Sequence, residues 1–125
     1  MLLGTGIDIC SVERMEKITV ESSFFRKYFS EEEQSYIIGK GNVKYNTMAG
    51  IFAAKEAFVK ALGTGFTDAG LKEISICHDP QGCPYYKPED MLWEKLRKLH
   101  IKKMHLSISH EAGIAIAMAV AEGEQ

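Results

Sequence analysis

The segment Ile114–Ala121 is apolar on both sides, and this constrains the fold more than any other feature of the sequence. As a strand it has alanine at alternate positions on one face, and the other face consists of Ile114, Ile116, Met118 and Val120. A strand without a polar face must be covered on both sides. A chain of 125 residues has too few helices to cover a whole sheet twice. We therefore expect a homo-oligomer whose sheets pack together; the alternative is a helix of the same chain covering both faces in turn.

The length and charge of the chain limit the remaining possibilities. The sequence predicts one domain over residues 1–125, without a repeat or linker. A net charge of −2 argues against a general nucleic-acid binder. The N-terminus does not resemble a signal peptide, and no run approaches the roughly 20 apolar residues that span a bilayer. Three unevenly spaced cysteines favour reduced thiols over a disulfide or zinc site. We expect a cytoplasmic protein without membrane contact.

Helices and strands are predicted along the whole chain. Strands are expected at 2–10, 71–78, 105–110 and 113–121, with an edge strand returning from Pro84 after a turn at 79–82. Ser11 can cap a helix to about residue 18, and a helical turn is expected at 24–29. Ser30 and Glu33 form a capping box that opens a helix ending at Gly39. Further helices are expected at 46–62 and 88–99, the latter with Met91 and Leu99 on its apolar side.

The helix predicted at 46–62 carries a lysine within its apolar stripe. Steps of about 100° place Lys55 among apolar residues, which are Met48, Ile51, Phe52, Phe58, Val59 and Leu62. A lysine there needs a partner or a route to solvent, because burying an isolated ammonium is costly. Glu56 and Lys60 lie just off the stripe, beside small alanines that would let another group approach the backbone. They are either a solvated charged flank or part of a site.

Asp8 and Glu56 together would suit a magnesium ion. Asp8 follows Gly4 and Gly6, whose missing side chains leave space on its own face of the first strand. Mg²⁺ prefers one or two protein carboxylates completed by waters and phosphate oxygens. The two residues would form such a site if the first strand packs against the long helix; otherwise Asp8 is a helix cap.

Two further features are compatible with phosphate binding or with a structural role. Gly63, Thr64 and Gly65 follow the long helix, and glycines there expose backbone N–H groups that can contact a phosphate. His110 ends a buried strand at a polar corner, after Ser107 and Ser109. Neither serine lies in a nucleophile elbow, so a serine hydrolase is not indicated.

These motifs, in this order, resemble the holo-[acyl-carrier-protein] synthase family of small phosphopantetheinyl transferases. The resemblance is carried by Gly6–Ile9, Phe52–Lys60, Gly63–Gly65, Gly82 with Pro84 and Tyr85, and Ser107–His110. It implies an α+β fold, a small mainly antiparallel sheet on one long helix, assembled as a trimer with coenzyme A bound between subunits. It implies transfer of 4'-phosphopantetheine from coenzyme A to a serine of an acyl carrier protein, with Mg²⁺, in support of fatty acid biosynthesis.

The resemblance also implies roles for individual residues. Asp8 and Glu56 match the Mg²⁺ ligands, and Lys60 matches a lysine that contacts the coenzyme A diphosphate. Gly63, Thr64, Gly65, Pro84 and His110 match positions that bind the coenzyme, His110 from the adjacent subunit. Phosphoryl transfer requires positioning and charge neutralisation, which Mg²⁺, Lys60 and Lys55 can supply. We hypothesise that Glu56, directly or through a bound water, also accepts the serine proton.

The acidic carrier protein should dock on a basic surface near the first helix. Arg14 matches the family position, and Lys17, Arg26 and Lys27 can extend the patch. The chain departs from the family at Ile51, where an arginine is common; Lys44 is a candidate to replace its phosphate contact. Two rival functions use the same residues: a Mg²⁺-dependent nucleotide pyrophosphohydrolase, and a non-catalytic scaffold that binds coenzyme A or the carrier.

Overall fold

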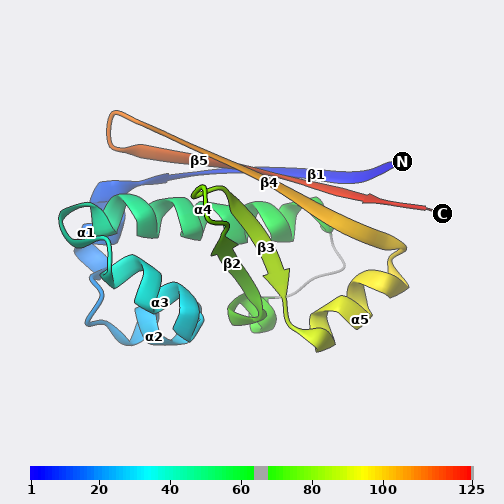
Figure 1. Cartoon of the computed structure of the whole chain (residues 1–125), viewed down its shortest axis with the longest axis horizontal. Helices are drawn as coiled ribbons and strands as arrows, with labels where there is room; N and C mark the ends of the chain where they lie inside the picture. The colour runs from blue at the N-terminus through cyan, green and yellow to red at the C-terminus, as the bar shows by residue number, and fades with distance from the viewer. Residues whose placement is uncertain (64–67, 125) are drawn as a thin grey trace.

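One long helix lies between a three-stranded sheet and a layer of short helices with a β-hairpin (Figure 1). The computed structural model describes residues 1–63 and 68–124. The sheet has the antiparallel order β1 (Leu2–Ser11), β5 (Ile114–Gly123), β4 (Ile101–Glu111). The long helix is α4 (Lys44–Ala61), and the hairpin joins β2 (Ile74–His78) to β3 (Pro84–Pro88). The predicted α+β fold is therefore confirmed.

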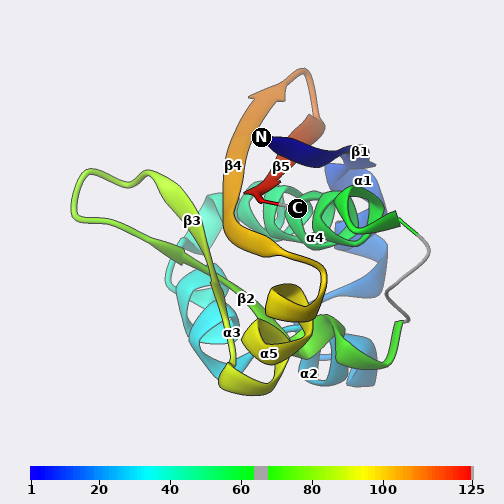
Figure 2. The ribbon, with the colours of Figure 1, turned by 90° about the vertical axis from the view of Figure 1, so that its right-hand side faces the viewer.

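The short helices surround the side of α4 that faces away from the sheet (Figures 1 and 2). They are α1 (Val12–Ile18), α2 (Ser23–Tyr28), α3 (Glu31–Ile38) and α5 (Asp90–Lys98), with 3-10 turns η1 (Gly41–Val43) and η3 (Asp68–Glu73). The predicted caps are present, since the Ser11 hydroxyl accepts from the Arg14 N–H. Both halves of the capping box between Ser30 and Glu33 are also made. Local sequence signals thus fix where the small helices begin.

Small residues bring the sheet very close to α4. The alanine face of β5 is buried toward this helix, as are Ala49, Ala53, Ala57 and Ala61 of the helix itself. β1 approaches closer still: a Cβ atom at Gly4 would collide with the carbonyl oxygen of Ala61, and one at Gly6 with that of Ala57. Glycine at these two positions is what lets β1 lie directly on the helix backbone.

The other face of the sheet is open and apolar. Ile7 pairs with Met118 and Ile9 with Ile116, and these four side chains are 38–61% exposed. A helix of the same chain covering both faces in turn was one expectation from the sequence. Within the described residues no helix covers this face, so that expectation is wrong.

Several element bounds differ from those predicted, for reasons in the tertiary structure. The strand expected at 71–78 begins at Ile74, because residues 68–73 form a 3-10 turn. Helix α5 buries fewer of its predicted apolar residues than expected. Met91 is 70% exposed and Leu99 is 40% exposed. The turn at 79–82 is confirmed, with the Gly82 N–H donating to the Asp79 carbonyl at 2.9 Å.

Two expectations from composition can be compared with the structure. Cys10, Cys77 and Cys83 are free thiols, as predicted. Among the described residues, no helix has both the length and the apolar character needed to cross a bilayer.

Candidate active site

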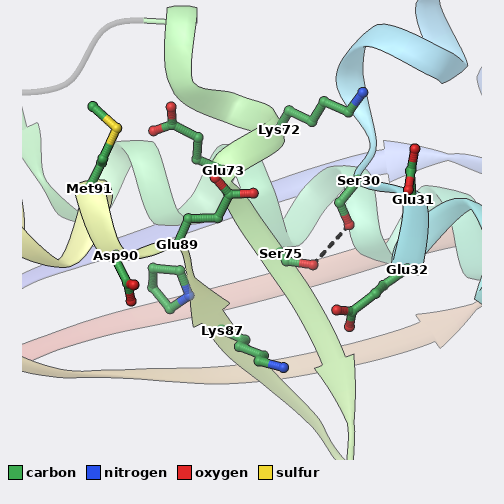
Figure 3. Close-up of a pocket in the computed structure, with 11 residues that line it drawn as sticks. Ser30, Glu31, Glu32, Lys72, Glu73, Ser75, Lys87, Glu89, Asp90 and Met91 are labelled. Atoms are coloured by element: carbon green, nitrogen blue, oxygen red, sulfur yellow. Dashed lines mark hydrogen bonds between the residues drawn. The ribbon is translucent and has the colours of Figure 1, made fainter.

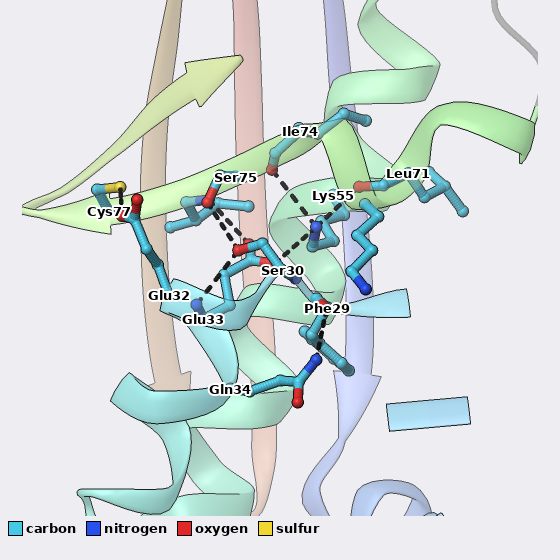
Figure 4. Close-up of polar contacts among 12 residues, drawn as sticks. Phe29, Ser30, Glu32, Glu33, Gln34, Lys55, Leu71, Ile74, Ser75 and Cys77 are labelled. Atoms are coloured by element: carbon cyan, nitrogen blue, oxygen red, sulfur yellow. Dashed lines mark hydrogen bonds and ion pairs between the residues drawn. The ribbon is translucent and has the colours of Figure 1, made fainter. Parts of the chain in front are cut away.

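Lys55 finds its partner in Glu33, in a cluster that joins three elements (Figure 4). The two side chains are fully buried and their charged atoms are 2.8 Å apart. Lys55 Nζ also donates to the Leu71 carbonyl at 2.8 Å, and Glu33 accepts from the backbone N–H groups of Ser30 and Ile76. The pair connects α4 to α3 and to the chain entering β2.

This burial corrects the catalytic role expected for Lys55. Desolvation lowers the pKa of its ammonium, and the Glu33 carboxylate opposes that shift. Its side chain has no exposed surface and its Nζ is held by protein acceptors, so it cannot contact a substrate phosphate in this structure. The sequence identified Glu33 only as a helix cap. The apolar surroundings of Lys55 had indicated that it needs a partner, but nothing in the sequence indicated that Glu33 is that partner.

Asp8 and Lys60 form a second, more exposed ion pair where β1 crosses α4. Lys60 Nζ lies 3.1 Å from Asp8 Oδ1 and also donates to the Ile7 carbonyl at 3.1 Å. The Lys60 side chain is 57% exposed, whereas that of Asp8 is 18% exposed. The condition set by the sequence, that β1 packs on the long helix, is met. The ammonium beside Asp8 shows that this carboxylate has room for a cationic partner.

Glu56 belongs to the same edge of α4. It lies four residues before Lys60, so the two side chains leave the same flank of the helix one turn apart. The pKa of the Tyr28 phenol is raised, first by burial and then by nearby negative charges. Those charges belong to Glu56, Glu33 and Asp8. Two carboxylates and a lysine therefore gather along this edge.

The donor set at this edge suits a hard divalent cation that arrives with a phosphate ligand. Within residues 1–63 and 68–124 there is no cluster of three or more His, Cys, Asp or Glu side chains that could hold a metal alone. Two carboxylates are what Mg²⁺ commonly takes from a protein when a substrate phosphate supplies other oxygens. Asp8 and Glu56 are therefore the residues of this edge that fit Mg²⁺.

The predicted carrier-binding residues lie on α1 and α2. The Arg14 guanidinium lies 4.7 Å from the centre of the Phe52 ring of α4. Lys17 pairs with Glu13 at 3.1 Å, and Arg26 donates to the Glu21 carbonyl at 2.9 Å. Lys27 is exposed on α2. All four predicted carrier-binding residues thus lie on two adjacent short helices.

A groove of about 340 Å³ gathers other predicted residues at the N-terminal part of α4. Pro84 and His110 both line it, and His110 Nε2 is 3.0 Å from the Asn46 carbonyl oxygen. Lys40, Tyr36 and His78 also line it; the Tyr36 and His78 rings stack with centroids 3.9 Å apart. The sequence did not single out these three, because they come from separate elements.

The remaining coenzyme-binding candidates lie outside this groove or outside the described residues. Lys44 is not among the residues that line the groove; its ammonium lies 5.4 Å from the Tyr45 ring centre. Gly63 has a positive φ of 69°, as expected for a residue that ends a helix. Thr64 and Gly65 lie outside the described residues. Ile51, in place of an arginine, lines the groove with an apolar side chain.

A larger groove of about 890 Å³ lies elsewhere, between α3, β2 and the start of α5 (Figure 3). Two lysines line it, against five acidic residues, which are Glu31, Glu32, Glu73, Glu89 and Asp90. An excess of negative charge disfavours phosphate groups. The larger groove is therefore a poor candidate for binding phosphate groups.

Comparison with known proteins identifies the family. The model of the 4'-phosphopantetheinyl transferase superfamily matches residues 4–119. The chain belongs to this superfamily. The phosphopantetheinyl transferase described here is 43% identical to the holo-[acyl-carrier-protein] synthase of Caldicellulosiruptor saccharolyticus over 125 residues, covering 100% of both chains. It is 42% identical to that of Clostridium tetani over 125 residues, with 99% of this chain and 98% of the relative covered.

Solved structures of the family share the fold of this transferase. The holo-[acyl-carrier-protein] synthase of Neisseria meningitidis has a TM-score of 0.87 at 34% identity, with 98% of this chain and 99% of that chain covered. The Helicobacter pylori enzyme, solved in complex with coenzyme A, has a TM-score of 0.76 at 34% identity, with 94% and 99% covered. The family resemblance stated from the motifs is confirmed, and the chain is an enzyme, a phosphopantetheinyl transferase.

Proposed function

We propose that this enzyme transfers 4'-phosphopantetheine from coenzyme A to a serine of an acyl carrier protein and so supports fatty acid biosynthesis. The observation that carries the proposal is the gathering of Asp8, Glu56 and Lys60 where β1 crosses α4. The names of the relatives and the coenzyme A bound to the Helicobacter pylori enzyme support the choice of substrates.

The proposed chemistry needs no nucleophile from this chain. The carrier serine oxygen bonds to the phosphorus that bears pantetheine, and the bond from that phosphorus to the bridging oxygen breaks. Adenosine 3',5'-bisphosphate leaves with the bridging oxygen. Glu56 accepts the serine proton, directly or through a water. Lys60 moves from Asp8 to a diphosphate oxygen, where a preorganised cation lowers the cost of developing charge. Mg²⁺ held by Asp8 and Glu56 would supply further charge neutralisation.

We assign the nucleotide end of coenzyme A to the groove that contains Pro84 and His110. Its lining offers the Lys40 ammonium and the stacked rings of Tyr36 and His78. Gly63, Thr64, Gly65 and Lys44 remain predicted contacts to the coenzyme. Many family members have an arginine at the position of Ile51. Because isoleucine cannot bind a phosphate, a nearby lysine has to supply the positive charge that binds this phosphate.

The carrier protein docks on α1 and α2 in this proposal. Arg14 lies over the ring of Phe52, one helical turn before Glu56, and can attract an acidic carrier to this part of α4, with Lys17, Arg26 and Lys27 extending the field. Exchange of Arg14 for Glu should weaken carrier binding and leave coenzyme A binding unchanged. Equal loss of both would contradict the assignment.

The proposed assembly is a homotrimer with active sites between subunits. The open sheet face formed by Ile7, Ile9, Ile116 and Met118 would be the surface that the copies bury. Sedimentation of a stable monomer at micromolar concentration would remove this part of the proposal.

Intact mass spectrometry of the carrier tests the function directly. We expect an apo acyl carrier protein incubated with the enzyme, coenzyme A and Mg²⁺ to gain one phosphopantetheine group. Release of bisphosphate from coenzyme A without a carrier would instead identify a pyrophosphohydrolase, and binding without mass gain a scaffold. Glu56→Gln should lose turnover; wild-type turnover at saturating Mg²⁺ would exclude its role as base.

A further inference from the structure

Arg14, the predicted carrier contact on α1, rests on an aromatic ring of the long helix. Helix α1 packs against α4 (Figure 1), and the Arg14 guanidinium lies over the Phe52 ring, 4.7 Å from its centre. Arg14 is exposed, whereas Phe52 is only 3% exposed. The face of an aromatic ring attracts a cation, and a planar guanidinium also stacks on it, which an ammonium does not. The ring therefore restricts the positions that this guanidinium can take.

The ring beneath Arg14 is itself fixed by other rings. Phe52 stacks with Tyr28 of α2, with ring centroids 5.1 Å apart and planes 19° from parallel. Phe24 lies 6.2 Å from Phe52 and stacks with Tyr28 at 4.9 Å. The Tyr28 hydroxyl is buried without a hydrogen-bond partner among the described residues, so Tyr28 contributes to this cluster through its ring. Three packed rings thus give Arg14 a fixed surface that joins α2 to α4.

The four predicted carrier-binding residues differ in how they are held. Lys17 pairs with Glu13, with side chains 76% and 74% exposed, and this carboxylate cancels part of the lysine's field. Arg26 donates to a backbone carbonyl at 2.9 Å, and Lys27 is exposed on α2. Within the residues that the structure describes, the Arg14 side chain neither forms an ion pair nor donates a hydrogen bond. Its N–H groups are therefore available to a partner while its position is restricted.

We propose that Phe52 is a positioning residue for the carrier protein, whose ring holds the Arg14 guanidinium ready to bind a carboxylate of the carrier. This inference rests on the proposed function, which docks the acidic carrier on α1 and α2. Stacking uses the face of a guanidinium and leaves the N–H donors at its edge, where a carboxylate accepts two of them. Phe52 is buried, so it acts on the carrier through Arg14 and not by contact.

The place of Phe52 on α4 connects this contact to the candidate active site. Phe52 and Glu56 are four residues apart, so they lie on the same side of the helix one turn apart. A carboxylate bound by Arg14 is then held near the turn of α4 that carries the proposed base. Immobilising a long side chain on binding costs affinity, and a ring that holds Arg14 in advance removes part of that cost. Phe52 should therefore strengthen carrier binding.

A double-mutant cycle tests this role, because a purely structural effect of Phe52 would not depend on Arg14. The variants are Phe52→Leu, Arg14→Met and the two combined. Isothermal titration calorimetry measures their dissociation constants for an apo acyl carrier protein and for coenzyme A. We expect Phe52→Leu to weaken carrier binding about three- to tenfold, to raise KM for the carrier with kcat unchanged, and to keep the affinity for coenzyme A. In the Arg14→Met background the same exchange should change carrier affinity less than about 1.5-fold.

Phe58→Leu is the matched control on the same helix. Phe58 is a buried phenylalanine whose ring packs edge-on against Tyr86, with centroids 4.9 Å apart. Its exchange should lower the melting temperature, as Phe52→Leu does, and leave carrier affinity unchanged. Phe52→Met is the second variant if Phe52→Leu does not fold, because methionine fills a similar space with a flexible side chain that has no aromatic face.

The outcomes separate this inference from the proposed function. An equal loss of carrier affinity with and without Arg14 would overturn the positioning role, and so would wild-type carrier affinity in Phe52→Leu. A wild type that binds the carrier but does not modify it would contradict the proposed function, and the cycle would still decide the role of Phe52. A wild type that binds no acyl carrier protein would overturn both the docking surface and its positioning residue.

Discussion

Two lysines of α4, five residues apart, form ion pairs that differ in nearly every physical respect. Lys55 and Glu33 are fully buried, and backbone groups satisfy their remaining hydrogen-bonding atoms. The side chain of Lys60 is 57% exposed, and its ammonium pairs with one carboxylate oxygen of Asp8. A buried pair is expensive to break, because a single partner leaves an unpaired charge out of water. An exposed pair contributes little to stability and can exchange its partner. The same helix thus buries one lysine in its fold and leaves another exposed, where it is available for the proposed chemistry.

The largest expected effect is the loss of the buried lysine. Lys55→Met leaves the Glu33 charge unpaired and should lower the free energy of unfolding by about 3–5 kcal/mol. Urea denaturation followed by circular dichroism measures this change. A decrease in the free energy of unfolding of less than about 1 kcal/mol would mean that water reaches the Glu33 carboxylate. The Lys55 pair would then contribute no more to stability than the exposed Lys60 pair.

A second variant tests whether the unpaired charge causes that loss. Adding Glu33→Gln to Lys55→Met removes the charge and keeps an oxygen that can accept from Ser30 or Ile76. The double variant should be more stable than Lys55→Met alone by about 1–3 kcal/mol, although the Leu71 carbonyl still lacks its donor. If Glu33→Gln instead lowers the free energy of unfolding further in the same urea experiment, the loss in Lys55→Met comes from altered packing and not from the unpaired charge.

The smallest expected effect on stability comes from the exposed lysine. Lys60→Met should change the free energy of unfolding by less than about 1 kcal/mol. It should lower kcat/KM for coenzyme A by about 100-fold, because a cation aimed at the diphosphate is lost. Lys102→Met is the control, since Lys102 forms a similar exposed pair with Glu124 at 3.1 Å and lies far along the chain from Asp8. Equal effects of both variants on turnover would contradict the role of Lys60.

The local and repetitive features of the fold could be predicted from the sequence. The capping box at Ser30, the turn after Asp79 and the two apolar faces of β5 each depend on a few neighbouring residues, and each was found. The metal site of Asp8 and Glu56 was predicted on the condition that the first strand packs against the long helix, and β1 does so through Gly4 and Gly6.

The features that the sequence did not reveal depend on residues distant along the chain. Glu33 and Lys55 are 22 positions apart on different helices, so no periodicity joins them. The missing hydrogen bond of the Tyr28 hydroxyl is a property of its surroundings and has no sequence signal. The groove that unites Lys40, His78 and His110 likewise arises from three separate elements.

The contact of Gly4 and Gly6 with the helix has a consequence for the spacing of the two carboxylates. Main chain meets main chain there, since the carbonyl oxygens of Ala61 and Ala57 occupy the positions that side chains would need. The gap between β1 and α4 therefore cannot be widened or narrowed by exchanging one apolar side chain for another of different size. A methyl group at residue 6 would meet the Ala57 carbonyl oxygen and so force Asp8 away from the helix that carries Glu56.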